Sequence, residues 1–263
     1  MPRFAANLSM MFTEVPFIER FAAAAAAGFD AVEFLFPYAH APEEVRDRVE
    51  ASGVEVVLFN MPPGNWDQGE RGLAVYPDRM DEFNAGLATA LRYAVELQVP
   101  RLHMMAGLAP SSDKSARGRY VDALQQASDA AGAAGLEVLI EPLNRHDMPG
   151  YFLDSFDLAV DIITDLGQPN VKLQYDIYHR QIMHGDVTRS LQAMLPLIGH
   201  IQTAAVPARN EPGTGELDDF RIFETVDRLG YAGWIGCEYR PKGQTLDGLG
   251  WLAKLDIAAG ARG

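Results

Sequence analysis

The chain has 263 residues, of which 48% are hydrophobic and 22% are charged, an ordinary balance for a globular protein with a sizeable core. Its formal net charge of −14 argues against nucleic acid as a partner, because such binding needs clustered Lys and Arg on the phosphates. Its single cysteine, Cys237, excludes an internal disulfide and a thiolate zinc motif.

The sequence carries no sign of a membrane or of secretion. No apolar run reaches the roughly 18 residues that span a bilayer, and the first residues lack the basic and apolar segments of a signal peptide. We therefore expect a cytoplasmic protein with no membrane partner. The length suits one domain over residues 1–263, and the oligomeric state stays open, a homo-oligomer included.

Strand-like and helix-like patterns alternate along the chain. Strands are expected at residues 3–7, 30–35, 55–60, 101–105, 137–141, 171–176, 199–203 and 234–238. Helices are expected at residues 15–27, 42–52, 79–98, 115–134, 155–166, 187–197, 218–229 and 245–258. Eight strand-then-helix units imply a parallel sheet, and eight such units close most simply into a single (β/α)8 TIM barrel.

Two connections that follow strands are longer than a turn requires, at residues 61–78 and 203–217. Long loops of this kind are usually either functional lids or disordered. Trp66 and Arg71 in the first loop favour a lid over the site.

Four consecutive strands end in a side chain that offers an oxygen atom. Glu141 ends the fifth strand, where Pro142 stops regular pairing, and Asp176, Gln202 and Glu238 end the next three. Ligands bind at the carboxyl ends of parallel strands, so these side chains are expected to meet at one mouth of the barrel. For a single strand-end carboxylate, a helix cap or a surface ion pair is the ordinary alternative.

The alternation within the sixth strand supports the inward direction of these groups. Residues at odd positions of 171–176 are apolar and those at even positions are polar, so the odd set is expected to face the helices and the even set the axis. The first four strands offer further polar residues for the inner rim, namely Asn7, Glu33, Asn60 and His103.

Three carboxylates held this close repel one another, and a divalent cation relieves that repulsion. All-oxygen ligation by Glu141, Asp176, Gln202 and Glu238 selects Mg²⁺, with Mn²⁺ as the alternative, over Zn²⁺. Glu141 and Glu238 are placed to flank a small substrate, one removing a proton beside a carbonyl and the other returning a proton to the adjacent carbon. That is an aldose–ketose isomerisation, which requires no organic cofactor.

The chain resembles the hydroxypyruvate isomerase family of xylose-isomerase-like barrels from residue 3 to about residue 242. The resemblance rests on the segments 4–12, 32–38, 69–72, 141–144, 174–179 and 211–216. It implies a divalent metal on the four strand ends, Glu141 and Glu238 as the acid/base pair, and interconversion of hydroxypyruvate and tartronate semialdehyde. Close relatives isomerise 2-oxo-tetronate instead, and these segments do not separate the two substrates.

Cationic side chains on the same face are candidates for binding the carboxylate of a 2-oxo acid. Arg71 is the first candidate because a planar guanidinium binds a carboxylate with two hydrogen bonds, and Arg209 and Lys242 are weaker ones. A solvated pair of Arg71 with Glu70 or Asp67 is the alternative.

Neutral and acidic residues near the strand ends are candidates for orienting the reaction. His179, three residues after Asp176, is expected to bond a substrate oxygen, with a surface histidine as the alternative. Asp147 and Asn144 are expected to position Glu141 through hydrogen bonds.

Three rival functions stay open. They are an epimerase or isomerase of neutral ketoses, a barrel that binds sugar acids without turnover, and a metallonuclease of the same barrel type. The last would want several histidine ligands and a basic groove, which six histidines and a charge of −14 disfavour.

Overall fold

The computed structural model describes residues 2–260 and shows a closed barrel of eight parallel strands, which confirms the (β/α)8 prediction. Neighbouring strands in the chain are neighbours in the barrel, and β8 pairs with β1. The strands are β1 (Arg3–Asn7), β2 (Ala31–Phe34), β3 (Glu55–Asn60), β4 (Arg101–His103), β5 (Glu137–Ile140), β6 (Val171–Asp176), β7 (Ile198–Thr203) and β8 (Trp234–Cys237).

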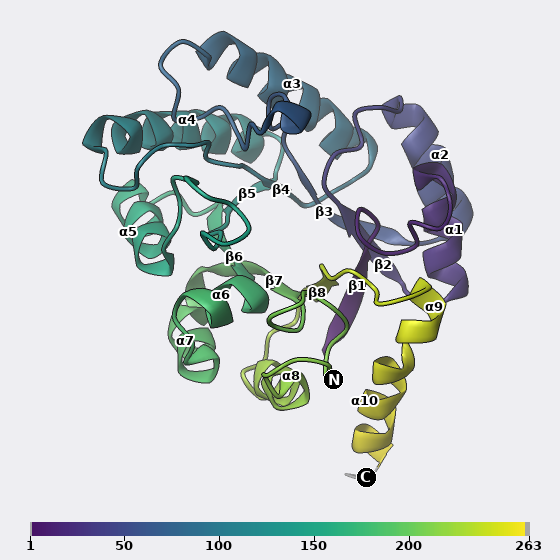
Figure 1. Cartoon of the computed structure of the whole chain (residues 1–263). Helices are drawn as coiled ribbons and strands as arrows, with labels where there is room; N and C mark the ends of the chain where they lie inside the picture. Colours follow the sequence, from purple (N-terminus) through teal and green to yellow (C-terminus); the bar gives the residue numbers. More distant parts are fainter. Residues whose placement is uncertain (1, 261–263) are drawn as a thin grey trace.

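Helices surround this ring of strands (Figure 1). They are α1 (Phe17–Ala26), α2 (Pro42–Ser52), α3 (Met80–Glu96), α4 (Lys114–Ala133), α5 (Phe156–Leu166), α6 (Ile177–Met183), α7 (Val187–Met194), α8 (Asp219–Arg228), α9 (Thr245–Gly248) and α10 (Gly250–Gly260). Two 3-10 helices, η1 (Trp66–Gln68) and η2 (Leu195–Leu197), lie between them. Within residues 2–260, no helix has both the length and the apolar character needed to cross a bilayer.

The structure differs from the sequence prediction in three helices. The helix expected at 245–258 is divided at Leu249, between two glycines that weaken helical backbone. The helix expected at 187–197 ends at Met194 and continues as η2, which contains a proline. The short helix α6 was not predicted, because it follows β6 without any connecting turn.

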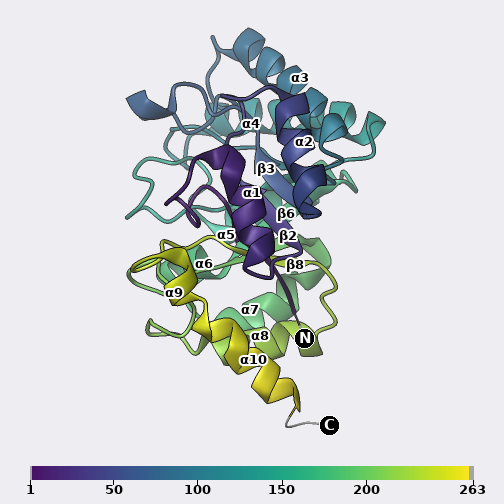
Figure 2. The ribbon, with the colours of Figure 1, turned by 90° about the vertical axis from the view of Figure 1, so that its right-hand side faces the viewer.

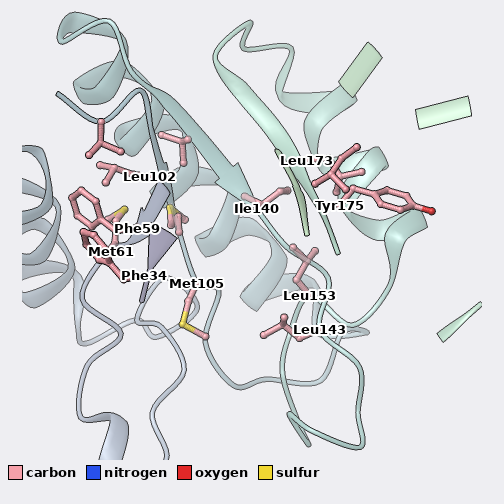
Figure 3. Packing of buried hydrophobic residues seen from close by; sticks show 14 of the residues in the cluster. Phe34, Phe59, Met61, Leu102, Met105, Ile140, Leu143, Leu153, Leu173 and Tyr175 are labelled. Carbon is pink, nitrogen blue, oxygen red and sulfur yellow. The ribbon is translucent and has the colours of Figure 1, made fainter. Parts of the chain in front are cut away.

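Apolar side chains fill two separate regions of the barrel. Val171, Leu173 and Tyr175 of β6 belong to the large cluster between strands and helices, as the alternation predicted. Figure 3 shows Leu173 and Tyr175 in this packing together with Ile140 of β5. A second, smaller cluster consists of Ala5, Ala31, Val57, Leu58 and Leu139. In β1, β2 and β5 the next residue of the same parity is polar, so a polar layer lies toward the carboxyl ends of the strands.

The last helix covers the seam where the barrel closes. Trp251 of α10 lies with its ring centroid 5.0 Å from that of Phe4 on β1 and 6.0 Å from that of Phe223 on α8. Its Nε1 donates a hydrogen bond of 3.2 Å to the hydroxyl of Tyr239, just after β8. Figure 2 shows α10 running beside α8. These contacts tie the end of the chain to its beginning.

A glycine on β8 makes room for a buried carboxylate inside the barrel. A Cβ atom at Gly236 would lie 2.2 Å from Oε2 of Glu33 on β2, far inside van der Waals contact. Glu33 is fully buried. The polar layer of the barrel therefore depends on the absence of a side chain at position 236.

We predict that Gly236→Ala destabilises the protein by about 1–3 kcal/mol, because the added methyl group displaces the Glu33 carboxylate from its partners. Urea unfolding measures this change. Gly118→Ala is the matched control, since Gly118 lies in α4 with open space around its Cβ position. That substitution should be neutral or stabilise by up to about 1 kcal/mol. Equal losses from the two substitutions would contradict the explanation.

Candidate active site

The four strand-end residues gather at one mouth of the barrel. Glu141 directly follows β5, Asp176 is the last residue of β6, Gln202 is the last but one of β7, and Glu238 directly follows β8. Their exposed fractions are 4%, 0%, 2% and 7%. All four strands are parallel, so their carboxyl ends open on the same face.

Asp176 serves both as the end of a strand and as the cap of a helix. Its Oδ1 accepts a hydrogen bond of 2.8 Å from the backbone N–H of Tyr178, at the start of α6. Its Oδ2 is buried without a hydrogen-bond partner. The capping contact fixes the carboxylate so that one oxygen remains available to the site.

Glu141 is held in the same way, by one oxygen. Its Oε2 accepts a hydrogen bond of 2.9 Å from Nε2 of Gln174 on β6, while its Oε1 is buried without a partner. His103 of β4 lies beside it, with Nδ1 3.7 Å from Oε2 of Glu141. Burial lowers the pKa of His103 to about 3, so this imidazole is neutral.

The hydrogen bonds of His179 determine which ring nitrogen carries the proton. Nδ1 accepts a hydrogen bond of 3.1 Å from the backbone N–H of Asn144, which can only donate. Burial lowers the pKa of His179 well below its ordinary value, so the ring is neutral and its proton lies on Nε2. Nε2 is 3.6 Å from Oδ2 of Asp176 and 3.9 Å from Oε1 of Glu141. His179 therefore presents a hydrogen-bond donor to the site.

Arg209, in the loop after β7, lies among the acidic groups. Its Nη2 donates a hydrogen bond to Oε2 of Glu238 and lies 3.6 Å from Oδ2 of Asp176. Its Nη1 lies 3.8 Å from Oδ2 of Asp147, and its guanidinium carbon lies 4.9 Å from the ring centroid of Tyr178. Arg209 is thus a buried cation that links three carboxylates: Asp147 in the loop after β5, Asp176 at the end of β6 and Glu238 just after β8.

The prediction that Asp147 and Asn144 hydrogen-bond Glu141 is wrong, because both residues bond other partners. Nδ2 of Asn144 donates to Oδ2 of Asp147 at 3.1 Å and lies 2.8 Å from Nδ1 of His179. The two residues therefore orient His179 and Arg209.

The clustered carboxyl groups hold their protons more tightly than usual. Burial raises the pKa of Glu141 well above its ordinary value, and the nearby charges of Glu238 and Asp176 add to this. Burial raises the pKa of Asp176 to about 6 and that of Glu238 to about 8, although Arg209 opposes both shifts. Burial alone lowers the pKa of Arg209, but its carboxylate neighbours raise it above the ordinary value.

This set of atoms fits a hard divalent cation. Glu141, Asp176 and His179 each offer a ligand atom within 4.8 Å of the others, and the two carboxylates contribute their unpartnered buried oxygens. The protonated Nε2 makes His179 unsuitable as a ligand, which leaves oxygen donors. When Glu141, Asp176 and Glu238 are all ionised, their three negative charges against one guanidinium leave two, which a divalent cation would neutralise.

Arg71 occupies a defined position in the loop after β3. Its guanidinium carbon lies 3.8 Å from the ring centroid of Trp66, and its Nη1 donates to the carbonyl oxygens of Trp66 and Glu70 at 3.0 and 2.7 Å. Its Nε lies 3.3 Å from Sδ of Met148, in the loop after β5. The Glu70 carboxylate binds Arg79, so the solvated pair of Arg71 with Glu70 is not formed.

Lys242 lies farther out. It is exposed and lines a cavity of about 430 Å³ together with Glu211 and Thr214. Its backbone N–H donates to Oε1 of Glu211 at 2.9 Å. The described contacts of Lys242 thus connect two loops at the rim and do not reach the four strand ends.

The sequence predicted that Gln174 and Glu33 face the inside of the barrel, but it did not predict their contacts beneath the strand ends. Gln174 was expected to face the axis, but nothing in the sequence indicated that it bridges Glu141 and Gln202. The buried contact of 2.6 Å between Glu33 and Nε2 of His200 was also missed. Their only sequence signal is their parity within the strands.

The chain matches the family described as xylose isomerase-like TIM barrel over residues 21–255. It is 54% identical over 254 residues to the 2-oxo-tetronate isomerase of Cupriavidus necator, covering 96% of this chain and 98% of that protein. It is 41% identical over 254 residues to the hydroxypyruvate isomerase of Escherichia coli, with the same coverage of 96% and 98%.

A solved structure described as an AP endonuclease, family 2, from Brucella melitensis is also similar. Its TM-score is 0.94 at 45% identity, and the match covers 97% of this chain and 99% of that one. The resemblance to hydroxypyruvate isomerase noted from the sequence segments is confirmed at the level of the family. The chain belongs to the xylose isomerase-like TIM barrel family.

Proposed function

We propose that the chain is a metal-dependent isomerase of short 2-oxo acids that carry a hydroxyl group on the adjacent carbon. The observation that carries this proposal is the pair of buried carboxylates, Glu141 and Asp176, each with one unpartnered oxygen at the barrel mouth. Glu141, Asp176, Gln202 and Glu238 would hold the cation. When bound, a divalent cation supplies a positive charge that stabilises negative charge on the substrate oxygens.

Glu238 and Glu141 act as the proton-transfer pair. Glu238, bonded to Arg209, is the carboxyl that loses its proton more readily, and it removes the proton from C3 of the substrate. Removal of this proton leaves an enediolate with its negative charge on the C2 oxygen. Glu141 delivers a proton to C2, and the proton of the C3 hydroxyl passes to the C2 oxygen. The C3 oxygen becomes the carbonyl, and in the reverse direction the two residues exchange roles. Nε2–H of His179 donates to a substrate oxygen and steadies its charge.

The two candidate substrates share the reacting atoms and differ at C3. Hydroxypyruvate carries hydrogen there and gives tartronate semialdehyde, whereas 2-oxo-tetronate carries a hydroxymethyl group. The identity of 54% to a 2-oxo-tetronate isomerase, against 41% to a hydroxypyruvate isomerase, favours the larger acid. Assays of the purified protein with both acids, in deuterium oxide, decide between them. Deuterium at the reacting carbons supports the enediol route, and complete transfer without exchange supports a hydride shift.

A nuclease activity, suggested by the description of the Brucella structure, fits this chain poorly. The net charge of −14 opposes a phosphate backbone, and the site adds further carboxylates. We propose that the enzyme acts on small molecules and not on nucleic acid. Cleavage of an abasic-site oligonucleotide by the metal-loaded protein would favour the nuclease.

Glu238→Gln should lower kcat by about 10²- to 10⁴-fold, because the amide keeps the shape and an oxygen ligand but cannot transfer a proton. Steady-state kinetics with both acids give kcat, and calorimetric titration shows whether the metal is still bound. Glu43→Gln, on the exposed first turn of α2, is the matched control and should behave as wild type. A Glu238→Gln enzyme with full activity rejects the acid/base role, and a wild type without turnover favours a non-catalytic binder of sugar acids.

Arg71→Ala should lower kcat/KM for 2-oxo acids by about 10- to 100-fold, as expected for the loss of a charged hydrogen bond to the substrate carboxylate. The loss should fall mainly on KM. Arg48→Ala removes an exposed arginine from α2 and serves as the control. Unchanged kcat/KM in Arg71→Ala would remove the carboxylate assignment, and activity on neutral ketoses in the wild type would point to an epimerase.

The raised carboxyl pKa values predict how pH affects stability with and without metal. A carboxyl whose pKa is higher in the folded than in the unfolded protein stabilises the fold while protonated, and this stability is lost as pH rises through the folded value. In EDTA, the contribution of Asp176 and Glu238 should therefore decline through pH values of about 6 and about 8.

Mg²⁺ competes with these protons, so it should raise the melting temperature more at pH 8 than at pH 5. Differential scanning fluorimetry measures both shifts. Asp176→Asn should lose most of the Mg²⁺-induced shift at pH 8. An equal shift at the two pH values would show that the cation binds elsewhere.

A further inference from the structure

We infer that Glu33 is a positioning residue for the metal site: it accepts the amide N–H of Gln202 and thereby keeps Oε1 of Gln202 turned toward Glu141. This inference rests on the proposed function, because it concerns how one proposed ligand is oriented. Glu33 lies on β2, on the far side of Gln202 from Glu141, and belongs to none of the groups assigned to the reaction so far.

Glu33 has hydrogen-bond partners on two other strands inside the barrel, β1 and β7. Its Oε1 accepts from Nδ2 of Asn7 at 2.9 Å and from Nε2 of Gln202 at 2.7 Å. Its Oε2 lies 2.6 Å from Nε2 of His200. All four residues are at most 2% exposed, so no solvent competes for these contacts. A buried carboxylate with this number of partners holds a defined position.

The hydrogen bonds continue from Gln202 to Glu141 of the proposed active site, and each amide can be oriented in only one way. Nε2 of Gln174 donates both to Oε1 of Gln202 at 2.7 Å and to Oε2 of Glu141 at 2.9 Å. The chain of hydrogen bonds runs from Glu33 through Gln202 and Gln174 to Glu141. Gln202 donates to Glu33, and Gln174 donates to both Gln202 and Glu141. If Gln202 were reversed, its oxygen would face the Glu33 carboxylate and its NH₂ would face the NH₂ of Gln174. Both contacts would be repulsive.

The direction matters because only one end of an amide binds a cation. The carbonyl oxygen has two lone pairs, of which Gln174 uses one and the other remains available, whereas the NH₂ group has none to offer. A reversed Gln202 would place two N–H groups where a ligand is needed. Glu33 therefore acts on the metal through Gln202, without touching it.

The barrel contains a space made for this carboxylate. At Gly236, opposite Gln202 in the pairing of β7 with β8, a Cβ would lie 2.2–2.4 Å from the carboxylate atoms of Glu33. Burial of an unused carboxylate is costly, and an apolar residue would fill the same region more favourably. The hydrogen bond that Glu33 accepts from Gln202 explains why a carboxylate is present at this buried position.

A reciprocal exchange tests the direction of the bond. Gln202→Glu places a second carboxylate against Glu33, so we expect the dissociation constant for Mn²⁺ to rise by at least about tenfold, as for other disrupted partners of metal ligands. Adding Glu33→Gln places an amide N–H donor at position 33 opposite the new carboxylate at position 202, so the contact again joins a donor and an acceptor. The double variant E33Q/Q202E should bind Mn²⁺ within about threefold of wild type or more tightly, since the new ligand is charged. Glu33→Gln should strengthen binding only in the Gln202→Glu background.

Calorimetry and the electron paramagnetic resonance of Mn²⁺ give these constants, and circular dichroism confirms that each variant is folded. Asn7→Ala is the control: it removes one donor to Glu33 but leaves the bond to Gln202, so it should lower the melting temperature without changing the Mn²⁺ constant. A double variant no tighter than Gln202→Glu, or a Gln202→Glu protein with wild-type affinity, overturns the inference. A wild-type protein that binds no Mn²⁺ would instead reject the proposed metal site.

Discussion

The mutual repulsion of buried carboxylates at the barrel mouth is the constraint on which the site depends. Closure of the parallel barrel brings Glu141, Asp176 and Glu238 to one rim, where water cannot screen them. One oxygen of each carboxyl group accepts a hydrogen bond. The donor is Gln174 for Glu141, the backbone of the first turn of α6 for Asp176, and Arg209 for Glu238. The charge that remains unpaired is what makes the rim suited to a divalent cation and to proton transfer.

The neutral imidazole of His179 and the cationic Arg209 act differently on the carboxylates of the rim. Asn144 fixes the proton of His179 on Nε2, so that the imidazole donates toward the carboxylates and does not compete as a ligand. Arg209 supplies a permanent positive charge between Glu238 and Asp176. Because Arg209 cannot lose its proton in this setting, it lowers the pKa of both carboxyls relative to burial alone. The proposed pair of acid/base glutamates would need such a balance to work near neutral pH.

Below the rim, the barrel interior changes from polar to apolar within a few residues. Ala5, Ala31 and Leu139 form part of the apolar cluster, and the residues two positions later in each strand are Asn7, Glu33 and Glu141. The register of β1 with β2 places Asn7 beside Glu33, and Nδ2 of Asn7 donates a hydrogen bond to Oε1 of Glu33. Glu33 accepts a hydrogen bond from Nε2 of Gln202, so we infer that the orientation of this proposed ligand depends on a residue outside the proposed catalytic pair.

The alternation of apolar runs and helical patterns was enough to predict the barrel, because each strand-then-helix unit is a local signal and eight such units close in one simple way. The convergence of Glu141, Asp176, Gln202 and Glu238 was also predictable, since parallel strands end on one face and side chains alternate with a period of two. The helix α6 and the partners of Arg209, His179 and Glu33 were decided only by the tertiary structure. These contacts join residues 26 to 169 positions apart, and they depend on side-chain geometry of a few ångströms that no local pattern encodes.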